Sequence, residues 1–384
     1  MKIKFYKLIA FLQRALVNIS FYTCKTFKVK KQDGWVVVAV ETASMLKNIS
    51  AALPGSVSVN FASNRFYDFR YDYEIYKNNN FFKIMNIAFS PLLLGYLLNR
   101  HDKFIYLGGV GFLSPFNDGR DAEFKLLKRK NIKLICCFMG SEIRSFSLLN
   151  EYAAQEKIDV ITTYQPISHI GIDSPNNEYA RKKLAEVADK YADKIINPAV
   201  DQMTYIKSST YPFIYFLSDS LFKPSLQKFD DLNEIIILHG PSSPIIKGTP
   251  LVRAAVKKLK VEGYRFKYVE LINVPHDKML KELQNAHIVL NEFYAFVPGV
   301  FGLEAMANQC ALLTSADENI ETTLPCGANK AWCVTPYWNI YDNLKNFLDS
   351  PEQIKPQAIA GFEWAKKNYQ YDAAVKKLNE IVND

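Results

Sequence analysis

A candidate diphosphate site lies in the segment 239–249, HGPSSPIIKGT, which follows an apolar run and opens a helical pattern. Four small residues keep this turn tight and leave its backbone N–H groups accessible. They are Gly240, Ser242, Ser243 and Gly248. Lys247 adds a positive charge beside them, and a helix start together with a lysine suits a diphosphate. An ordinary strand-to-helix turn has the same composition, so both interpretations stay open.

A carboxylate in the segment 291–315, NEFYAFVPGVFGLEAMANQCALLTS, is the second candidate for chemistry. An apolar run leads into a turn at Gly299 and then into a short helical pattern that carries Glu304 between apolar neighbours. A carboxylate near a helix start often only complements the helix dipole. An ionised group in so apolar a helix nevertheless needs a partner, and sugar hydroxyls would provide one.

Four segments together resemble the GT-B glycosyltransferases of the glycogen-synthase-like family 4, and among them the bacterial surface-polysaccharide enzymes. Residues 299–307 match the family's G-x-F/Y-x-x-E-A-M-A block, and 239–249 match its H-A-P-S-x-x-x-x-K-G-T block. Residues 273–293, NVPHDKMLKELQNAHIVLNEF, are similar to its V-P-H-x-x-A-L block, and 139–144, MGSEIR, resemble its H-G-S-D-V-R. The segment 363–381 looks like the family's closing helices.

The resemblance implies transfer of a sugar from a nucleotide-sugar donor to a glycan or glycolipid acceptor, with retention at the anomeric carbon and without a metal or other cofactor. It makes Lys247 and Glu142 the catalytic candidates. Lys247 would neutralise the departing diphosphate, and Glu142 would face the donor sugar and the acceptor hydroxyl. Glu304 would accept hydrogen bonds from the ribose. The implied donor-binding residues are Ser242, Ser243, Lys247, Gly248, Gly299, Val300, Phe301 and Glu304.

Three positions depart from the family's pattern. Phe296 stands where the family has a sugar-binding glutamate, Pro244 where an arginine is common, and Met139 where it has a histidine. Glu292 lies four residues before Phe296 and is not interpreted as its substitute. The departures leave open an alternative function, a catalytically impaired GT-B-like subunit that acts as a binding or assembly partner in polysaccharide biosynthesis.

The acceptor-side candidates come from the first part of the chain. Glu41 follows the predicted strand 35–40, and Gly109 and Gly111 belong to the loop 107–111, LGGVG. Glycines let a ligand approach the backbone, but they also make ordinary tight turns, and both interpretations stay open. Arg144 is expected to be a structural partner of its loop rather than a reactant.

From Gly34 onward, short apolar runs alternate with helical patterns, which is typical of α/β layering. We predict two doubly wound Rossmann-like domains that face a cleft, as in the GT-B fold, with ligands outside the carboxyl ends of the strands. The first domain is expected at 34–215 and the second at 225–364, and a helix at about 365–384 is expected to pack back on the first. The predicted strands are 35–40, 57–60, 104–107, 133–138, 158–162 and 194–197, then 234–238, 266–271, 286–290, 310–314 and 330–334.

The 384-residue chain carries 47 basic and 39 acidic side chains, a net charge of +8. Eight of the basic residues lie within 1–31, which contains no acidic residue, so the remainder carries 39 of each sign. This balance argues against nucleic acid as a partner. Six cysteines without metal-ligand spacing favour a reduced, cytoplasmic compartment.

The basic stretch 1–33 is interpreted as an amphipathic N-terminal extension. One face of its helical wheel is apolar: Phe5, Leu8, Ile9, Leu12, Leu16 and Ile19. We predict that residues 1–31 bind an anionic membrane surface and hold the protein at the inner face of the cell membrane. A helix that docks on its own protein is the second interpretation. The apolar run 81–98 is interpreted as a kinked core helix, with lipid or acceptor contact as the second interpretation.

Overall fold

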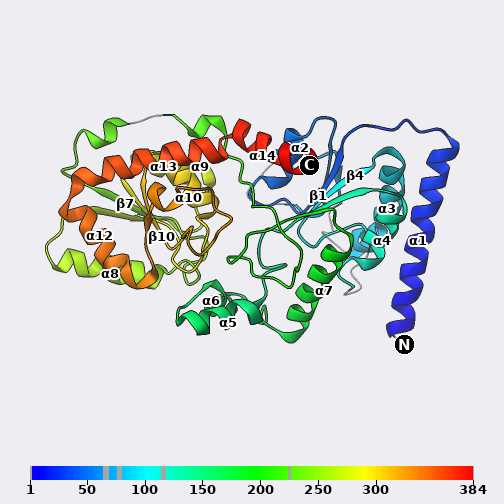
Figure 1. Ribbon diagram of the computed structural model, residues 1–384, viewed down its shortest axis with the longest axis horizontal. Coiled ribbons are helices and arrows are strands. Elements are labelled where there is room, and N and C mark those ends of the chain that lie inside the picture. The colour runs from blue at the N-terminus through cyan, green and yellow to red at the C-terminus, as the bar shows by residue number, and fades with distance from the viewer. Residues whose placement is uncertain (1, 64–68, 76–79, 114–117, 224–225, 384) are drawn as a thin grey trace.

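The computed structural model describes residues 2–63, 69–75, 80–113, 118–223 and 226–383. They form two α/β domains side by side along the long axis of the molecule, and a long N-terminal helix lies at one end (Figure 1). The predicted fold class, two doubly wound Rossmann-like domains, is thereby confirmed. No helix within these residues is long and apolar enough to cross a membrane.

The first domain contains a parallel sheet of six strands in the order β3-β2-β1-β4-β5-β6. Chain order reverses between β1 and β4, so the loops after these two strands diverge and leave a crevice at their carboxyl ends. Every residue of β1, WVVVA, is buried, as expected for a central parallel strand covered on both faces. The strands are β1 Trp35–Ala39, β2 Val57–Asn60, β3 Tyr73–Glu74, β4 Lys103–Leu107, β5 Lys133–Cys137 and β6 Lys194–Ile196.

The second domain contains a parallel sheet of five strands in the order β11-β10-β9-β7-β8. Its switch point lies between β7 and β9, so the loops that follow these strands open the corresponding crevice. The strands are β7 Ile236–His239, β8 Lys267–Glu270, β9 Ile288–Leu290, β10 Ala311–Thr314 and β11 Cys333–Val334.

Helices cover both faces of each sheet. Those before the second sheet are α1 Lys2–Thr26, α2 Met45–Ala52, α3 Asn80–Arg100, α4 Asp121–Arg129, α5 Phe146–Glu156, α6 Ile161–Ser168 and α7 Pro175–Tyr191. The others are α8 Thr249–Val261, α9 His276–Asn285, α10 Gly299–Ala307, α11 Ala328–Ala331, α12 Ile340–Asp349, α13 Ile354–Tyr369 and α14 Tyr371–Asn383. Short 3₁₀ turns are η1 Asp219–Leu221, η2 Leu226–Phe229, η3 Tyr337–Asn339 and η4 Pro351–Gln353.

The chain crosses back to the first domain at its C-terminus. Helix α13 packs in the second domain, the chain turns at Gln370, and α14 then packs on the first domain (Figure 1). Ala374 and Leu378 are buried against the first sheet, and the Lys133 ammonium donates to the Val382 carbonyl at 2.6 Å.

The predicted strand 158–162 is wrong. Val160 caps α6, which begins at Ile161, and the segment before it pairs with no strand in the described part of the chain. Val160 packs with Leu149 and with Phe296 of the second domain. The apolar residues of this segment are therefore explained by the contact between the domains rather than by the sheet.

Helix α1 docks on α3, which is the second interpretation given above. Val17 is fully buried, and the Gln13 amide donates to the Ile87 carbonyl at 3.1 Å. A Cβ on Gly95 would lie 2.3 Å from the Val17 carbonyl oxygen, so glycine at this position permits the close approach of the two helices. Pro91 lies inside α3 without ending it.

Candidate functional site

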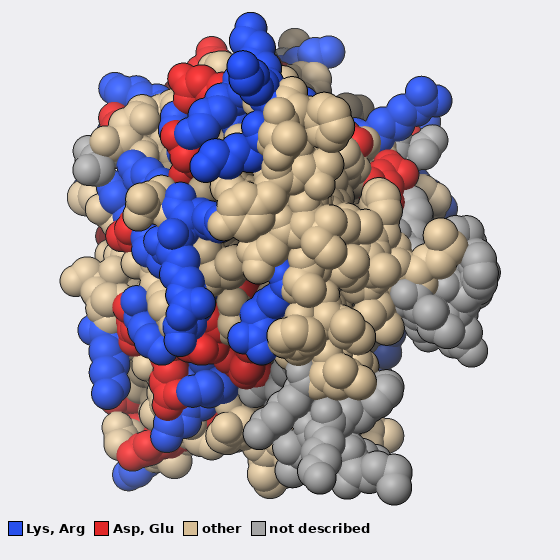
Figure 2. Space-filling view, turned by 90° about the vertical axis from the view of Figure 1, so that its right-hand side faces the viewer, with Lys and Arg blue, Asp and Glu red and all other residues tan. Residues whose placement is uncertain are grey.

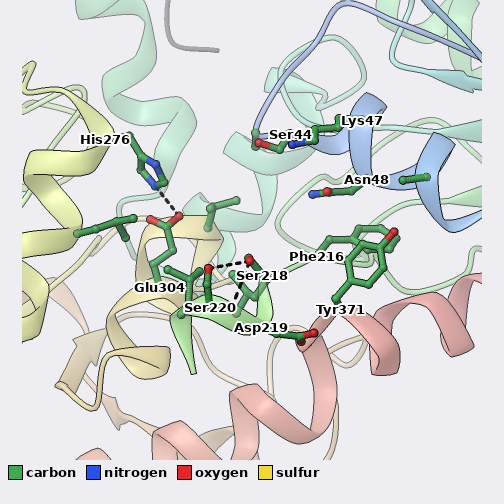
Figure 3. A pocket seen from close by; sticks show the side chains of 16 residues that line it. Ser44, Lys47, Asn48, Phe216, Ser218, Asp219, Ser220, His276, Glu304 and Tyr371 are labelled. Carbon is green, nitrogen blue, oxygen red and sulfur yellow. Dashed lines mark hydrogen bonds and ion pairs between the residues drawn. The ribbon is translucent and has the colours of Figure 1, made fainter. Parts of the chain in front are cut away.

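Two of the cavities that the described residues line between the domains adjoin each other. The larger cavity, of about 520 Å³, is lined by Lys47 of α2, by 216–221, and by His276 and Glu304 of the second domain (Figure 3). The smaller cavity, of about 210 Å³, is lined by Met139, Arg144, Asp201, Glu292 and Gly299, among others. Val300 lines both cavities, so they adjoin at the first turn of α10.

Glu304 occupies the wall of the larger cavity, as the resemblance implied for a ribose-binding residue. Its carboxylate receives a hydrogen bond of 2.8 Å from Nε2 of His276, which starts helix α9 (Figure 3). The hydrogen bond that His276 donates to Glu304 is the main cause that raises the pKa of His276 above its usual value. The Glu304 side chain is nearly buried. The apolar side chains next to it in α10 offer no polar partner, so His276 provides one.

Lys247 forms an ion pair with the Glu292 carboxylate. Glu292 is buried at the end of β9, and burial raises its pKa although Lys247 counteracts that shift. A Cβ on Gly299 would lie 3.0 Å from Glu292 Oε1, so the start of α10 lies directly beside this carboxylate. The predicted phosphate-binding lysine is thus linked to the start of α10 only through Glu292, a carboxylate set aside in the sequence analysis that balances its charge. Lys247 is not among the described residues that line the two cavities, and its donor contact stays a prediction.

The turn between β7 and α8 is tightly packed. A Cβ on Gly240 would lie 2.7 Å from Met279 Cε and 2.8 Å from Phe301 Cζ, so glycine here brings the turn close to α9 and α10. Ser242 is exposed and Ser243 half-buried, and Gly248 has a φ of 77° where α8 begins. None of these three residues is among the described residues that line the two cavities, and their donor contacts stay predictions.

His239 has a structural role in this arrangement. Its two ring nitrogens bond to the Leu290 carbonyl at 2.7 Å and to the Thr249 hydroxyl at 2.8 Å. Burial lowers its pKa to about 4, so the ring is neutral at physiological pH. The histidine connects β7, β9 and α8, and thereby fixes the two loops that carry Lys247 and Glu292.

The loop between β1 and α2 contributes strained backbone to both cavities. Ala43 and Ser44 have φ values of 51° and 61°, in the left-handed region that residues with a Cβ rarely adopt. Ala43 lines both cavities and Ser44 lines the larger one. Such strain costs on the order of 1–3 kcal/mol per residue and is concentrated at functional sites. The sequence pattern pointed to Glu41 of this loop but not to Ala43 or Ser44, because neither residue type signals positive φ.

Glu41 holds this loop in place. Its buried carboxylate accepts hydrogen bonds from the backbone N–H of Leu46 at 3.3 Å and of Lys47 at 3.1 Å, and from the Tyr71 hydroxyl at 2.8 Å. It therefore caps the start of α2. Its predicted acceptor contact stays a prediction, and Glu41 is not among the described residues that line these two cavities.

Gly109 and Gly111 lie in a loop with clear structural ties. The Gly109 carbonyl accepts from Arg120 Nε at 2.9 Å, and a Cβ on Gly111 would lie 2.7 Å from the Glu123 carboxylate oxygens. That buried carboxylate also accepts from the backbone N–H of Phe112 and Leu113, at 3.0 Å each. The turn interpretation accounts for both glycines, and an acceptor role for them stays a prediction.

Glu142 and Arg144 leave the end of β5 in different directions. The Glu142 carboxylate accepts from the Met139 backbone N–H at 2.6 Å and lies beside Gly108. Glu142 is not among the described residues that line either cavity. Arg144 instead lines the smaller cavity and is paired there with Asp201, with Nη2 2.8 Å from Oδ2. This ion pair fits the structural role expected for Arg144.

Phe296, the residue at the position of the missing glutamate, points away from the cavities. Its ring lies 6.0 Å from that of Tyr152 in an edge-to-face contact, and its backbone N–H donates to Asp201 at 2.8 Å. The carboxylate that reaches the smaller cavity is Glu292. Glu292 was set aside in the sequence analysis and Asp201 was not noticed, because their partners are distant in the chain and only the fold brings them together.

Comparison with known proteins identifies the fold. No family profile matches the sequence, and no curated protein matches it either. The crystal structure of HepE from Anabaena in complex with UDP-glucose matches with a TM-score of 0.53 at 12% identity, over 92% of this chain and 99% of that one. A glycosyltransferase from Rickettsia africae matches with a TM-score of 0.53 at 13% identity, over 91% and 97%.

A third solved structure, an α-glucosyltransferase in complex with UDP and a 13-mer DNA, matches with a TM-score of 0.54 at 9% identity, over 92% of this chain and 100% of that one. These likenesses extend over both domains and their relative arrangement. The chain therefore has the GT-B fold, with its cavities between the two domains as that fold places them.

Proposed function

We propose that the protein is a glycosyltransferase that moves a sugar from a nucleotide-sugar to a lipid-linked or surface-polysaccharide acceptor, with retention and without a metal. The observation that carries the proposal is the meeting of the two cavities at the start of α10. Glu304 faces the larger cavity, and Gly299 lines the smaller. One short helix thus offers a carboxylate to hydroxyl groups and its N-terminal N–H groups to a diphosphate.

In this proposal the donor spans both cavities. The nucleoside occupies the larger one, where its ribose hydroxyls donate to Glu304, and the diphosphate lies at Gly299–Phe301. The sugar then lies in the smaller cavity, beside Glu292. Lys247 turns from Glu292 toward the diphosphate as negative charge develops on the leaving group, and this stabilises the transition state.

The remaining predicted residues keep supporting roles. Ser242, Ser243 and Gly248 would border the diphosphate from the β7–α8 turn. Glu142 would approach the donor sugar and the acceptor hydroxyl from the first domain. This role requires a change in the position of its side chain, which now bonds to the Met139 backbone.

A UDP-sugar is the first donor to test. HepE is bound to UDP-glucose and the α-glucosyltransferase to UDP in their solved structures. The acceptor class would place the protein at the cytoplasmic face of the cell membrane, attached through residues 1–31. The exposed lysines at the end of α1 and after it suit an anionic lipid surface.

One observation favours the alternative function, a catalytically impaired subunit. Both cations near the smaller cavity are already neutralised, Lys247 by Glu292 and Arg144 by Asp201. A protein that only binds the nucleotide would tolerate this arrangement, whereas transfer requires Lys247 to change partners. Turnover of the donor separates the two functions.

The experiment is hydrolysis or transfer of nucleotide-sugars by the full chain, compared with Lys247→Ala and Glu304→Ala. We expect each substitution to lower turnover at least tenfold, because each removes a charged contact to the donor. Lys257→Ala and Glu234→Ala, two exposed positions in the second domain, are matched controls. Parental rates in both site variants would refute the site assignment, and donor binding without turnover would favour the impaired subunit.

A further inference from the structure

The cleft contains few basic side chains, although the surface of the molecule carries many. Figure 2 looks onto the end of the first domain that α1 occupies, away from the second domain, and shows many Lys and Arg side chains there. Among the described residues that line the two adjoining cavities, the lysine and arginine residues are Lys47 at the larger cavity and Arg144 at the smaller one. A diphosphate is strongly anionic, so the partners of these two side chains determine how the cleft can balance its charge.

Arg144 is already bound to a carboxylate. Its Nη2 lies 2.8 Å from Asp201 Oδ2, and its Nε donates to the Asp201 carbonyl at 2.6 Å. Lys247, the cation that the resemblance implied, lines neither cavity in the described part of the chain and is paired with Glu292. Each of these two cations would have to leave a buried carboxylate before it binds a phosphate, and a buried carboxylate without a partner is strongly destabilising.

Lys47 forms no ion pair with any residue that the structure describes. Its side chain is exposed, and its Nζ lies 4.0 Å from the centre of the Phe69 ring. A cation is attracted to the face of an aromatic ring, but the ring has no net charge, so the positive charge of the lysine stays available. Glu41 accepts a hydrogen bond from the Lys47 N–H at 3.1 Å, and this carboxylate therefore holds the backbone of the lysine rather than its ammonium.

Lys47 faces the second domain across the larger cavity. Figure 3 shows Lys47 and Ser44 on the side of this cavity opposite Glu304. Val300, in the first turn of α10, lines the same cavity. Asp219 and Glu304 are the acidic side chains among its described lining residues, and neither forms an ion pair with Lys47. A ligand between α2 and the start of α10 would thus meet an ammonium from the first domain and helix N–H groups from the second.

We infer that Lys47 binds the diphosphate of the donor from the first domain. The inference rests on the proposed function and adds a second cation to it, one that leaves no carboxylate unpaired when it binds the donor. Lys47 stays an ammonium throughout and exchanges no proton with the donor, so it acts through its charge alone. The pairing of Lys247 and Arg144 favours an impaired subunit only if no other cation reaches the donor, and Lys47 is such a cation.

The test is calorimetric titration of the full chain with UDP, with uridine and with inorganic pyrophosphate. We expect Lys47→Ala to bind UDP at least tenfold more weakly than the parent and to bind uridine equally well, because uridine has no phosphate. Glu304→Ala should weaken the binding of both, because both contain the ribose. Lys47→Arg keeps the charge and should bind UDP more tightly than Lys47→Ala does. Lys182→Ala is the matched control, because Lys182 is another exposed lysine of the first domain, with its Nζ 5.5 Å from the centre of the Tyr205 ring.

Equal affinity of Lys47→Ala and the parent for UDP would overturn the inference, and so would equal losses of UDP and uridine affinity. A parent that binds neither UDP nor uridine would contradict the proposed donor site. In that case, or where uridine alone is not bound, pyrophosphate decides on Lys47. Pyrophosphate binding that is at least tenfold weaker in Lys47→Ala would leave the inference standing. Pyrophosphate binding that is absent from the parent, or unchanged in Lys47→Ala, would overturn it.

Discussion

At the residue scale, two ion pairs determine the charge that a donor would meet. His276 is paired with Glu304 at the larger cavity, and Lys247 with Glu292 at the smaller one. Each pair joins a cleft residue to a partner from another segment of the second domain. The two carboxylates are nearly buried, so each needs its partner as a compensating contact.

The first prediction concerns His276. Its pKa is raised by Glu304, so the pair stabilises the fold below the ordinary histidine pKa and loses this effect as the pH rises through the raised value. His276→Gln should therefore lower the free energy of unfolding more at pH 5.5 than at pH 8.5. The histidine side chain is 44% exposed, so screening limits the difference to about 1 kcal/mol or less. Denaturant melts at the two pH values measure it, and equal losses would contradict the pairing.

The second prediction concerns Lys247 and Glu292. Lys247→Ala leaves a buried carboxylate unpaired, and we expect a loss of about 2 kcal/mol in the free energy of unfolding at neutral pH. The pKa of Glu292 is already raised, so the loss should shrink as the pH falls and Glu292 takes up a proton. The double variant Lys247→Ala/Glu292→Gln should recover most of the stability. Additive losses in this double-mutant cycle would show that the two side chains do not interact.

At the element scale, α1 depends on its contact with one glycine of α3. A Cβ on Gly95 would lie 2.3 Å from the Val17 carbonyl oxygen and 2.8 Å from the Ser20 Cβ, so any larger side chain forces the two helices apart. The contact therefore determines whether α1 lies against the protein or leaves it.

The third prediction is that Gly95→Val displaces α1 without unfolding the domains. Trypsin should then cleave at Arg14 and Lys25 at least tenfold faster than in the parent, because a helix without its packing partner is marginal in water. Ala88→Val, an exposed position of the same helix, is the control and should leave cleavage unchanged. Protection of α1 in Gly95→Val would show that the helix is held by other contacts.

Elements whose pattern is local were predictable from the sequence. Helix α8 begins at Thr249, at the end of the segment 239–249 that was expected to open a helix, and central strands such as β1 followed from continuous apolar runs. The prediction of a strand at 158–162 was wrong because an apolar pattern shows that residues are buried but does not show which part of the protein they pack against. The helical wheel of α1 predicted an apolar face that includes Leu8, Leu12 and Ile19. The structure leaves these side chains exposed, and the helix docks through a different side, around Val17.

At the scale of the whole molecule, a buried carboxylate of the second domain binds the backbone of the first. Glu321 is fully buried and accepts hydrogen bonds from the N–H groups of Ala199, Val200 and Asp201, at 2.7–2.8 Å. Phe296 adds an apolar contact at the same junction. These contacts hold the two walls of the cleft together, and they explain why Phe296 is apolar.

The fourth prediction is that Glu321→Ala opens the cleft. Three N–H groups, of which that of Asp201 is buried, lose their buried acceptor, so we expect a loss of about 3 kcal/mol in the free energy of unfolding. Small-angle scattering should show a larger radius of gyration at a temperature where both proteins are folded. Glu352→Ala, an exposed position, is the control. An unchanged radius together with unchanged stability would mean that this junction does not hold the domains.

The arrangement of the cleft was less predictable than the elements. The resemblance implied donor contacts for Glu304 and Lys247, which stay predictions; Glu304 lines the larger cavity, whereas Lys247 is paired with Glu292 and lines neither cavity as the described residues define them. The pairing of Lys247 with Glu292, 45 residues further along the chain, arises only when the loops after β7 and β9 meet at the switch point of the sheet. The sequence pattern therefore predicts the position of each of these two loops in the chain, but it does not predict that the two loops contact each other.

The central claim is that a nucleotide-sugar binds where Glu304 and the start of α10 face the cleft, and calorimetric titration of UDP tests it most directly. The account predicts saturable binding at one site per chain in the parent and in Glu234→Ala. It predicts at least tenfold weaker binding in Glu304→Ala, because two hydroxyl hydrogen bonds to a carboxylate are lost. Equal affinity of Glu304→Ala and the parent for UDP would contradict the account.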